Sequence, residues 1–237
     1  MKPVLVWDLP IRIFHWLLSL CCLAAIALAL GAPEHSRAFD FHMLLGLMLL
    51  PLIIFRLLWG LIGTRYSRFQ SFLYRPRAAV DYLIGVMTNN SKRYLGHNPA
   101  ASFAIFAMLV LIPGSVISGL LMPGSEIFEE LHEMVSFGLL AVIGAHLLGV
   151  LSHIVVHKEN VVLSMLTGRK MGLDSESIPS AHSLVALVLL VLMGGWSTAI
   201  VKNYDFSTKK LEVPVSGTLI QLGKSEKQGD QQEHDDD

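Results

Sequence analysis

The stretch that decides the fold reads LHEMVSFGLLAVIGAHLLGVLSH, from Leu131 to His153. It is apolar and reaches the roughly 20 residues that a helix needs to cross a bilayer, yet it contains three histidines. Ionisable groups inside a membrane-spanning helix are costly and usually mark a functional site. His132 and His146 are separated by about 21 Å along a helix axis and by about 40° less than four full turns. Both imidazoles are therefore expected on nearly the same face of one helix, one toward each side of the membrane.

The composition is that of an integral membrane protein. Of 237 residues, 53% are hydrophobic and 16% charged, and the mean hydropathy is +0.55. The net charge of -1 gives no reason to expect a nucleic acid partner. The cysteines, Cys21 and Cys22, are adjacent in an apolar run, so they form neither a CxxCH motif for covalent haem attachment nor a zinc site. We expect them to be packing residues.

Five hydrophobic runs have about the length of a membrane-spanning helix. They cover residues 11–31, 39–62, 100–122, 131–156 and 183–201. The first run contains Arg12 and His15 and lacks a small-residue cleavage pattern, which favours a retained helix over a signal peptide. The pattern predicts an all-α integral membrane protein.

Loop charges predict the orientation. Residues 63–99 contain six Lys or Arg and one acid, Asp81, whereas residues 123–130 contain three glutamates and no Lys or Arg. The positive-inside rule places the basic loop in the cytoplasm. The N-terminus is then cytoplasmic, and residues 202–237 are external if the fifth run crosses the membrane.

The basic loop also carries structural signals. Residues 69–95 mix apolar and basic side chains, which predicts a helix along the membrane surface. Asn98 is expected to cap the next span and Pro99 to be its first helical residue. Pro113 and Gly114 are expected to kink that span.

The depths of four histidines match in pairs. With a rise of about 1.5 Å per residue, His42 and His132 lie within a few ångströms of the external face. His15 and His146 lie about 22 to 23 Å below that face on the same reckoning. Neutral imidazole is a common iron ligand. The two pairs therefore predict two stacked haems, each iron being held by a histidine on either side.

Other polar residues leave alternatives open. Arg56 shares the face of His42 at the depth of the inner pair and needs an anion, either a haem propionate or Asp8. Any single histidine could instead be a hydrogen-bonding residue between helices. His153 and His157 are expected at the membrane interface, and His97 in a loop or beside a quinone. A final set of small residues is expected to allow close helix approach or to make room for a flat ring: Gly46, Gly138, Gly144 and Gly149.

Several motifs together resemble the prokaryotic cytochrome b561 family, which includes the cytochrome b subunits of nickel-iron hydrogenases. They lie between about residues 4 and 170 and read VWDLPIRIFHW, FHMLLGLMLLPLIIFRLLWGLIG, RYLGHNP, LHE, AHLLGVLSH and HKEN. The resemblance implies a four-helix bundle that encloses two b haems and exchanges electrons with membrane quinone. Carried over by motif, the axial ligands are His15, His42, His132 and His146, the same four that the depths select.

The resemblance completes the sequence-based expectations. We expect a cytochrome b561-like domain over 1–170, a cytoplasmic linker and fifth helix over 171–201, and a polar, periplasmic tail over 202–237. The protein would lie in the bacterial inner membrane and transfer electrons between quinone and a redox partner.

Partner and function class stay open at this stage. The acidic tail would suit a basic c-type cytochrome, or would simply be a solvated chain end. The alternatives are a membrane anchor for a hydrogenase or another dehydrogenase, and a small transporter or haem-handling protein. The oligomeric state is open, a homodimer included.

Overall fold

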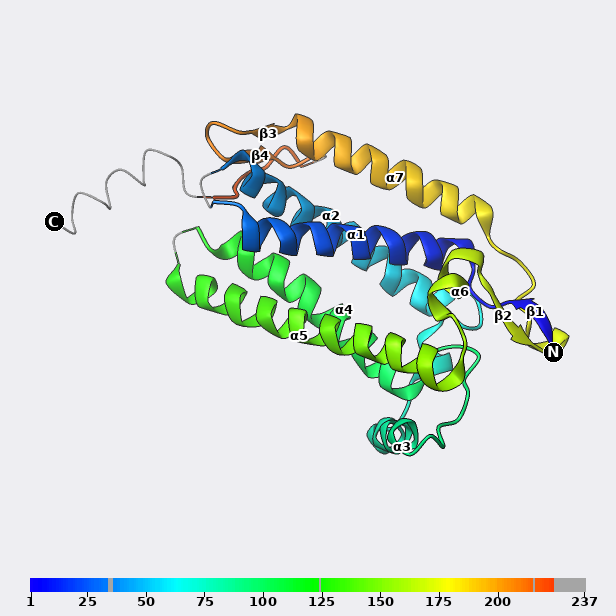
Figure 1. Ribbon diagram of the computed structural model, residues 1–237. Coiled ribbons are helices and arrows are strands. Elements are labelled where there is room, and N and C mark those ends of the chain that lie inside the picture. The colour runs from blue at the N-terminus through cyan, green and yellow to red at the C-terminus, as the bar shows by residue number, and fades with distance from the viewer. Residues whose placement is uncertain (34–35, 124, 215, 224–237) are drawn as a thin grey trace. The chain divides into compact units, whose positions relative to one another are not determined.

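The computed structural model describes residues 1–33, 36–123, 125–214 and 216–223 (Figure 1). Five helices in these ranges have the length and apolar composition of membrane spans. They are α1 (Leu9–Gly31), α2 (Arg37–Ile62), α4 (Pro99–Leu121), α5 (Glu126–His157) and α7 (Ser183–Lys202). All five predicted runs are confirmed, and the chain is a multi-pass membrane protein. The helix that contains Leu131 to His153 begins five residues earlier than the predicted run.

The predicted start of α4 is confirmed. Pro99 is its first residue, and the Asn98 side chain accepts a 2.8 Å hydrogen bond from the Ala101 backbone N–H. This is an N-cap that satisfies one of the free donors of the first turn. The helix continues through Pro113 and ends at Leu121.

Shorter elements connect the spans. The helical ones are η1 (Phe69–Phe72), α3 (Pro76–Met87), α6 (Val161–Thr167) and η2 (Asp174–Glu176). The strands are β1 (Lys2–Leu5), β2 (Arg169–Gly172), β3 (Tyr204–Asp205), β4 (Lys210–Glu212) and β5 (Leu219–Gln221). The two small sheets that these strands form add to the expected all-α bundle.

The chain divides into two compact units, and the boundaries fall inside the long helices. The first unit comprises Met1–Trp16, Ile53–Leu111 and Phe137–Val188. The second unit comprises Leu17–Leu52, Ile112–Ser136 and Leu189–Asp237, as far as the described residues go. His15 and His146 belong to the first unit, and His42 and His132 to the second.

In the first unit, the N-terminal strand pairs with the segment that follows α6. β1 pairs antiparallel with β2, with Lys2 opposite Gly172 and Leu5 opposite Arg169. Between α6 and β2, Gly168 has a φ of 79°, which only glycine adopts without strain. A Cβ there would lie 2.8 Å from the Trp7 carbonyl oxygen, so glycine also permits the close approach of two backbones.

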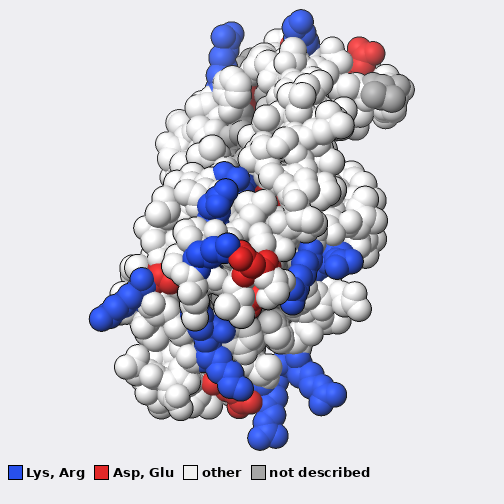
Figure 2. All heavy atoms as spheres, turned by 90° about the vertical axis from the view of Figure 1, so that its right-hand side faces the viewer, with Lys and Arg blue, Asp and Glu red and all other residues white. Residues whose placement is uncertain are grey.

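The first unit also carries most of the basic loops. Figure 2 looks onto the side where β1 and β2 lie, and Lys and Arg side chains are prominent on it. In Figure 1, α3 is seen nearly end-on in the view that shows α4 and α5 lengthwise. That orientation suits the predicted helix along a membrane surface. The helix is shorter than the predicted range of residues 69–95, since it begins at Pro76 and is capped by Thr88.

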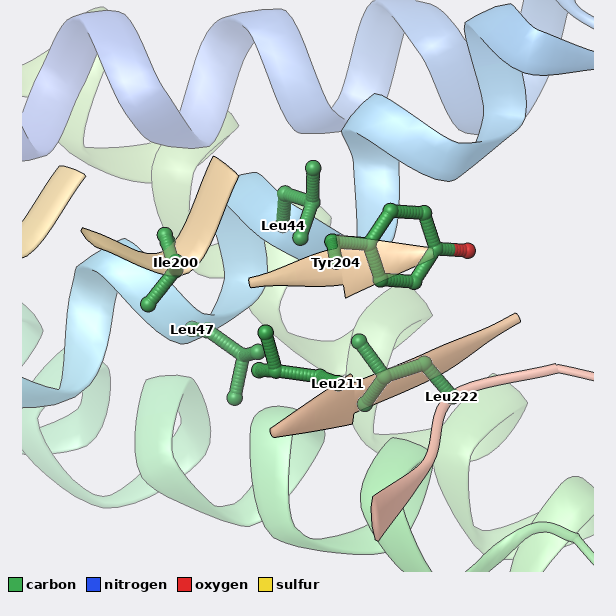
Figure 3. Close-up of a cluster of buried hydrophobic side chains, with 6 residues drawn as sticks. All are labelled: Leu44, Leu47, Ile200, Tyr204, Leu211 and Leu222. Carbon is green, nitrogen blue, oxygen red and sulfur yellow. The ribbon is translucent and has the colours of Figure 1, made fainter. Parts of the chain in front are cut away.

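In the second unit, the segment after α7 folds back onto α2. β3, β4 and β5 form an antiparallel sheet, with Tyr204 opposite Leu211 and Leu211 opposite Ile220. The sheet covers a buried apolar cluster drawn in Figure 3: Leu44, Leu47, Ile200, Tyr204, Leu211 and Leu222. Residues 224–237, the acidic end of the predicted tail over 202–237, lie outside the described residues.

Candidate cofactor sites

His42 and His132 meet in the second unit. Their ring centroids are 6.3 Å apart and the ring planes are nearly perpendicular, at 88°. Metal–imidazole bonds are about 2 Å long, so two imidazoles on opposite sides of one metal have centroids about 6 Å apart. The observed separation fits one metal ion between the two rings.

Backbone carbonyls orient both rings. His42 Nδ1 lies 2.9 Å from the Ala25 carbonyl oxygen, and His132 Nδ1 lies 2.8 Å from the Ser115 carbonyl oxygen. A carbonyl only accepts hydrogen bonds, so Nδ1 carries the proton in each ring and Nε2 keeps its lone pair. Metal-binding histidines commonly have their second nitrogen held in this way.

A glycine on α4 lies against the His132 ring. A Cβ on Gly119 would be 3.1 Å from both Nδ1 and Cε1 of His132. This distance is shorter than ordinary van der Waals contact, so a larger side chain would displace the ring. Gly119 was not singled out from the sequence, because a glycine in an apolar span gives no local signal of what it contacts.

His15 and His146 come together in the first unit, close enough for their charges to interact. The His15 ring lies edge-on to Trp16, with centroids 5.3 Å apart. Its Nδ1 is buried without a hydrogen-bond partner among the described residues. The inner pair therefore lacks, at His15, the carbonyl that orients each ring of the outer pair.

Arg56 is buried, at 2% exposure. Its Nη1 donates to the Ser67 carbonyl oxygen at 3.1 Å, while Nη2 has no partner among the described residues. Asp8, the competing partner, is fully buried and accepts hydrogen bonds from four other groups. The donors are Trp59 Nε1, Thr64 Oγ1, Ser67 Oγ and the Ile11 backbone N–H. No Arg56–Asp8 ion pair occurs within 4.0 Å, which leaves Arg56 free to bind another anion.

Two histidines at each site fit a haem iron better than a metal ion bound by protein side chains alone. Across the part of the chain that is described, no three His, Cys, Asp or Glu side chains gather as metal ligands. A haem iron needs only two axial ligands, because the porphyrin supplies the other four. Gly138, Gly144 and Gly149 have no described atom within 4 Å of an added Cβ. Their surroundings do not support the expected close helix approach.

Charged and polar side chains, of which Lys170 and His153 are buried, surround Glu159. The carboxylate contacts Arg93 at 3.2 Å, His153 at 3.4 Å and Lys170 at 3.7 Å. Burial opposes ionisation of Glu159, but the hydrogen bond from Arg93 and the charge of Lys170 outweigh it and lower its pKa. Burial lowers the pKa of Lys170. His153, expected at the interface, is 6% exposed and lies within this network.

His97 lines a pocket of about 340 Å³ in the first unit. Three tyrosines, Tyr66, Tyr74 and Tyr94, line the same pocket, and Arg65 lies at it too. This volume is within the usual range for small-molecule sites. The sequence placed His97 in a loop, which is correct, but did not predict that its Nδ1 is buried and unpartnered.

The family profile described as prokaryotic cytochrome b561 matches residues 6–168. This is more than half of the chain and includes all four histidines of the two pairs. The chain belongs to the prokaryotic cytochrome b561 family. It is therefore a membrane cytochrome b of the electron-transport class, and b-type haem is its cofactor.

Curated relatives carry consistent names. A probable Ni/Fe-hydrogenase B-type cytochrome subunit of Rhizobium leguminosarum bv. viciae is 23% identical over 219 residues, which covers 74% of this chain and 92% of the relative. The Bradyrhizobium diazoefficiens protein of the same name is 21% identical, covering 72% and 87%. A probable Ni/Fe-hydrogenase 1 B-type cytochrome subunit of Escherichia coli K12 is 26% identical, covering 48% and 57%. No solved structure matches the chain.

Proposed function

We propose that the chain binds two b haems and carries electrons between a membrane-bound hydrogenase and the quinone pool. The observation that carries the proposal is the His42–His132 pair, whose 6.3 Å separation and carbonyl-bound Nδ1 atoms suit two axial ligands. His15 and His146 would hold the second haem in the first unit. When bound, the haems would supply reversible one-electron chemistry.

The protein's own groups would set the geometry of each site. The Ala25 and Ser115 carbonyls keep the Nε2 atoms of the outer pair directed for coordination. Gly119 lets α4 approach His132 without displacing its ring. At the inner site, Arg56 would neutralise a haem propionate, since its Nη2 is buried and Asp8 is engaged elsewhere.

The names of the relatives favour a hydrogenase as the redox partner. Residues 6–168 match the family, so the shared region covers both histidine pairs. A hydrogenase releases electrons that a haem pair can pass to quinone. The cell location that we propose is the bacterial inner membrane, with the N-terminus and the basic loops of the first unit in the cytoplasm.

The quinone head group would bind in the pocket that His97 lines. Support comes from its volume of about 340 Å³ and from the three tyrosine rings at its wall. Aromatic rings stack well against a flat head group. His97 lines the pocket and interacts electrostatically with His15 and His146, so the pocket is near the inner pair.

A c-type cytochrome is the second candidate partner. Three glutamates at the start of α5, Glu126, Glu129 and Glu130, are exposed and would attract a basic protein. These glutamates also interact favourably with the positive N-terminal end of α5. Their presence there therefore does not require a partner protein.

The test uses membranes that contain the chain with or without a nickel-iron hydrogenase. Hydrogen should produce reduced b-type absorption bands only when both proteins are present, and added quinone should reoxidise them. Reduction by hydrogen without the hydrogenase, or bands that quinone leaves unchanged, would contradict the proposal. A reduced c-type cytochrome that restores the bands would favour the second partner.

A further inference from the structure

In addition to Nδ1 of His15, two buried nitrogen atoms of the first unit have no hydrogen-bond partner among the described residues. They are Nη2 of Arg56 and Nδ1 of His97. A buried polar group without a partner costs about 1 to 3 kcal/mol, and more when it is charged. Nη2 of Arg56 is a donor, and Nδ1 of His97 is a donor in the tautomer that carries the ring proton there, so one acceptor can satisfy both nitrogens.

Aromatic rings position both side chains. The Arg56 guanidinium lies 4.6 Å from the Phe69 ring centroid and 5.7 Å from that of Phe72. The His97 ring lies 4.4 Å from Phe72 and 4.8 Å from Trp7. Phe72 thus lies next to both groups, and His97 interacts electrostatically with Arg56 and with both histidines of the inner pair.

The two groups differ in charge. Burial lowers the pKa of His97 to about 3, and the positive charges of Arg56 and Lys170 act in the same direction. His97 is therefore a neutral imidazole that offers one N–H donor. Arg56 supplies the positive charge, and a guanidinium with a free N–H group is well suited to a carboxylate.

We propose that Arg56 and His97 together bind one carboxylate, a propionate of the haem held by His15 and His146, with His97 as a positioning residue. This inference rests on the proposed function, because it needs a haem at the inner pair. Each donor hydrogen-bonds one carboxylate oxygen, and this satisfies both unpartnered nitrogens. We call Arg56 and His97 the carboxylate seat.

The seat affects the inner haem in two ways. The charge of Arg56 favours the reduced iron, which carries one positive charge fewer, and so raises the midpoint potential. His97 adds no charge, so it acts on retention and orientation of the haem. His42 and His132 belong to the other compact unit, so the haem that they would hold serves as an internal control.

The test compares His97→Phe, His97→Gln and Arg56→Gln in the full chain. The matched control is His182→Phe, since His182 also packs edge-on against an aromatic ring of the first unit, 5.5 Å from Trp59, and is outside the seat. Haem content, haem dissociation rate and the midpoint potential of each haem are measured. Apoprotein from haem-deficient cells is also loaded with haem and with its dimethyl ester, which has no free carboxylates.

We expect His97→Phe to release the inner haem about tenfold faster, whereas His97→Gln, which keeps an N–H donor, stays close to wild type. Arg56→Gln should lower the inner midpoint potential by about 59 mV, a tenfold change for one electron. With the dimethyl ester, the wild type, His97→Phe and His97→Gln should release the inner haem at the same rate, whereas the charge of Arg56 still acts on the potential of the iron. An unchanged outer haem shows that each variant is folded.

Two results overturn the seat. One is an inner haem that His97→Phe leaves unchanged in dissociation rate. The other is faster haem release in His97→Phe that persists with the dimethyl ester, which would show that His97 does not act through a propionate. Wild-type protein with fewer than two haems would instead contradict the proposed function, so the two failures are distinguishable.

Discussion

A buried ion pair attaches the C-terminal sheet to α2. Lys209 Nζ lies 2.8 Å from both carboxylate oxygens of Asp40, and Tyr204 Oη donates to the same carboxylate at 3.1 Å. The exposed fractions are 7% for Lys209 and 1% for Asp40. Lys209 also has a φ of 54°, a strained value for a residue with a side chain.

We predict that Lys209→Met detaches the sheet. Removing one member of a buried ion pair costs about 3 to 5 kcal/mol, because the other charge stays buried without its partner. If the sheet opens locally, amide exchange in β3, β4 and β5 should be about 10² to 4 × 10³ times faster, since each 1.4 kcal/mol is tenfold. A reporter amide is that of Leu222, which donates to the Lys209 carbonyl at 2.9 Å.

The assay is hydrogen exchange by mass spectrometry in lipid nanodiscs. Lys210→Met is the matched control, because Lys210 is the next residue, is exposed and makes no ion pair among the described residues. The double variant Lys209→Met with Asp40→Asn should recover most of the protection, since no buried charge remains. Exchange rates in Lys209→Met that equal those of Lys210→Met would refute the reasoning.

Three further predictions concern single positions. Gly119→Leu should displace the His132 ring and halve the haem content measured by haemochrome absorbance. The control Gly195→Ala should keep the wild-type haem content, because no described atom lies within 4 Å of an added Cβ there. Equal haem contents in the two variants would contradict the close contact between Gly119 and His132. Gly168→Ala should lower stability by about 1 to 3 kcal/mol because of its positive φ and the Trp7 carbonyl, and a thermal unfolding midpoint equal to wild type would count against this. The folded-state pKa of Glu159 lies below its ordinary value of 4.5, so its stabilisation is present above that value and is lost as the pH falls through the folded pKa. The unfolding midpoints of wild type and Glu159→Gln should therefore differ at pH 7 and converge below about pH 4.5, and a constant difference would argue against the charged network.

Local patterns predicted the spans well. Long apolar runs, the Asn98 cap and the Pro99 start depend only on neighbouring residues, and the structure confirms them. The matched depths of His42 and His132 were also readable, since rise per residue is nearly constant in a helix. The structure brings these two rings together.

Long-range polar contacts were not predictable in the same way. Asp40 and Lys209 are 169 residues apart, and neither gives a local signal of the other. The pairing of β1 with β2 likewise depends on how the chain returns after α6. The sequence predicted His153 at the membrane interface and did not predict its place in the Glu159 network. Glu159 and Lys170 follow α5 in a loop and a strand, and the pattern of a helix does not predict where such segments lie.

The burial of His97 was missed for a related reason. Its segment is short and polar in sequence, which is typical of a solvated loop. Phe72 and Trp7, which cover its ring, come from segments far away along the chain. Aromatic cover of this kind depends on tertiary packing.

The most direct test of the whole account is haem stoichiometry in the wild type and in four single variants. These are His15→Ala, His42→Ala, His132→Ala and His146→Ala. Because each iron needs a histidine on both sides, we predict two haems per wild-type chain and about one in each variant, with the outer haem lost when His42 or His132 is replaced. Retention of both haems in any variant, or a single haem in the wild type, would contradict the account.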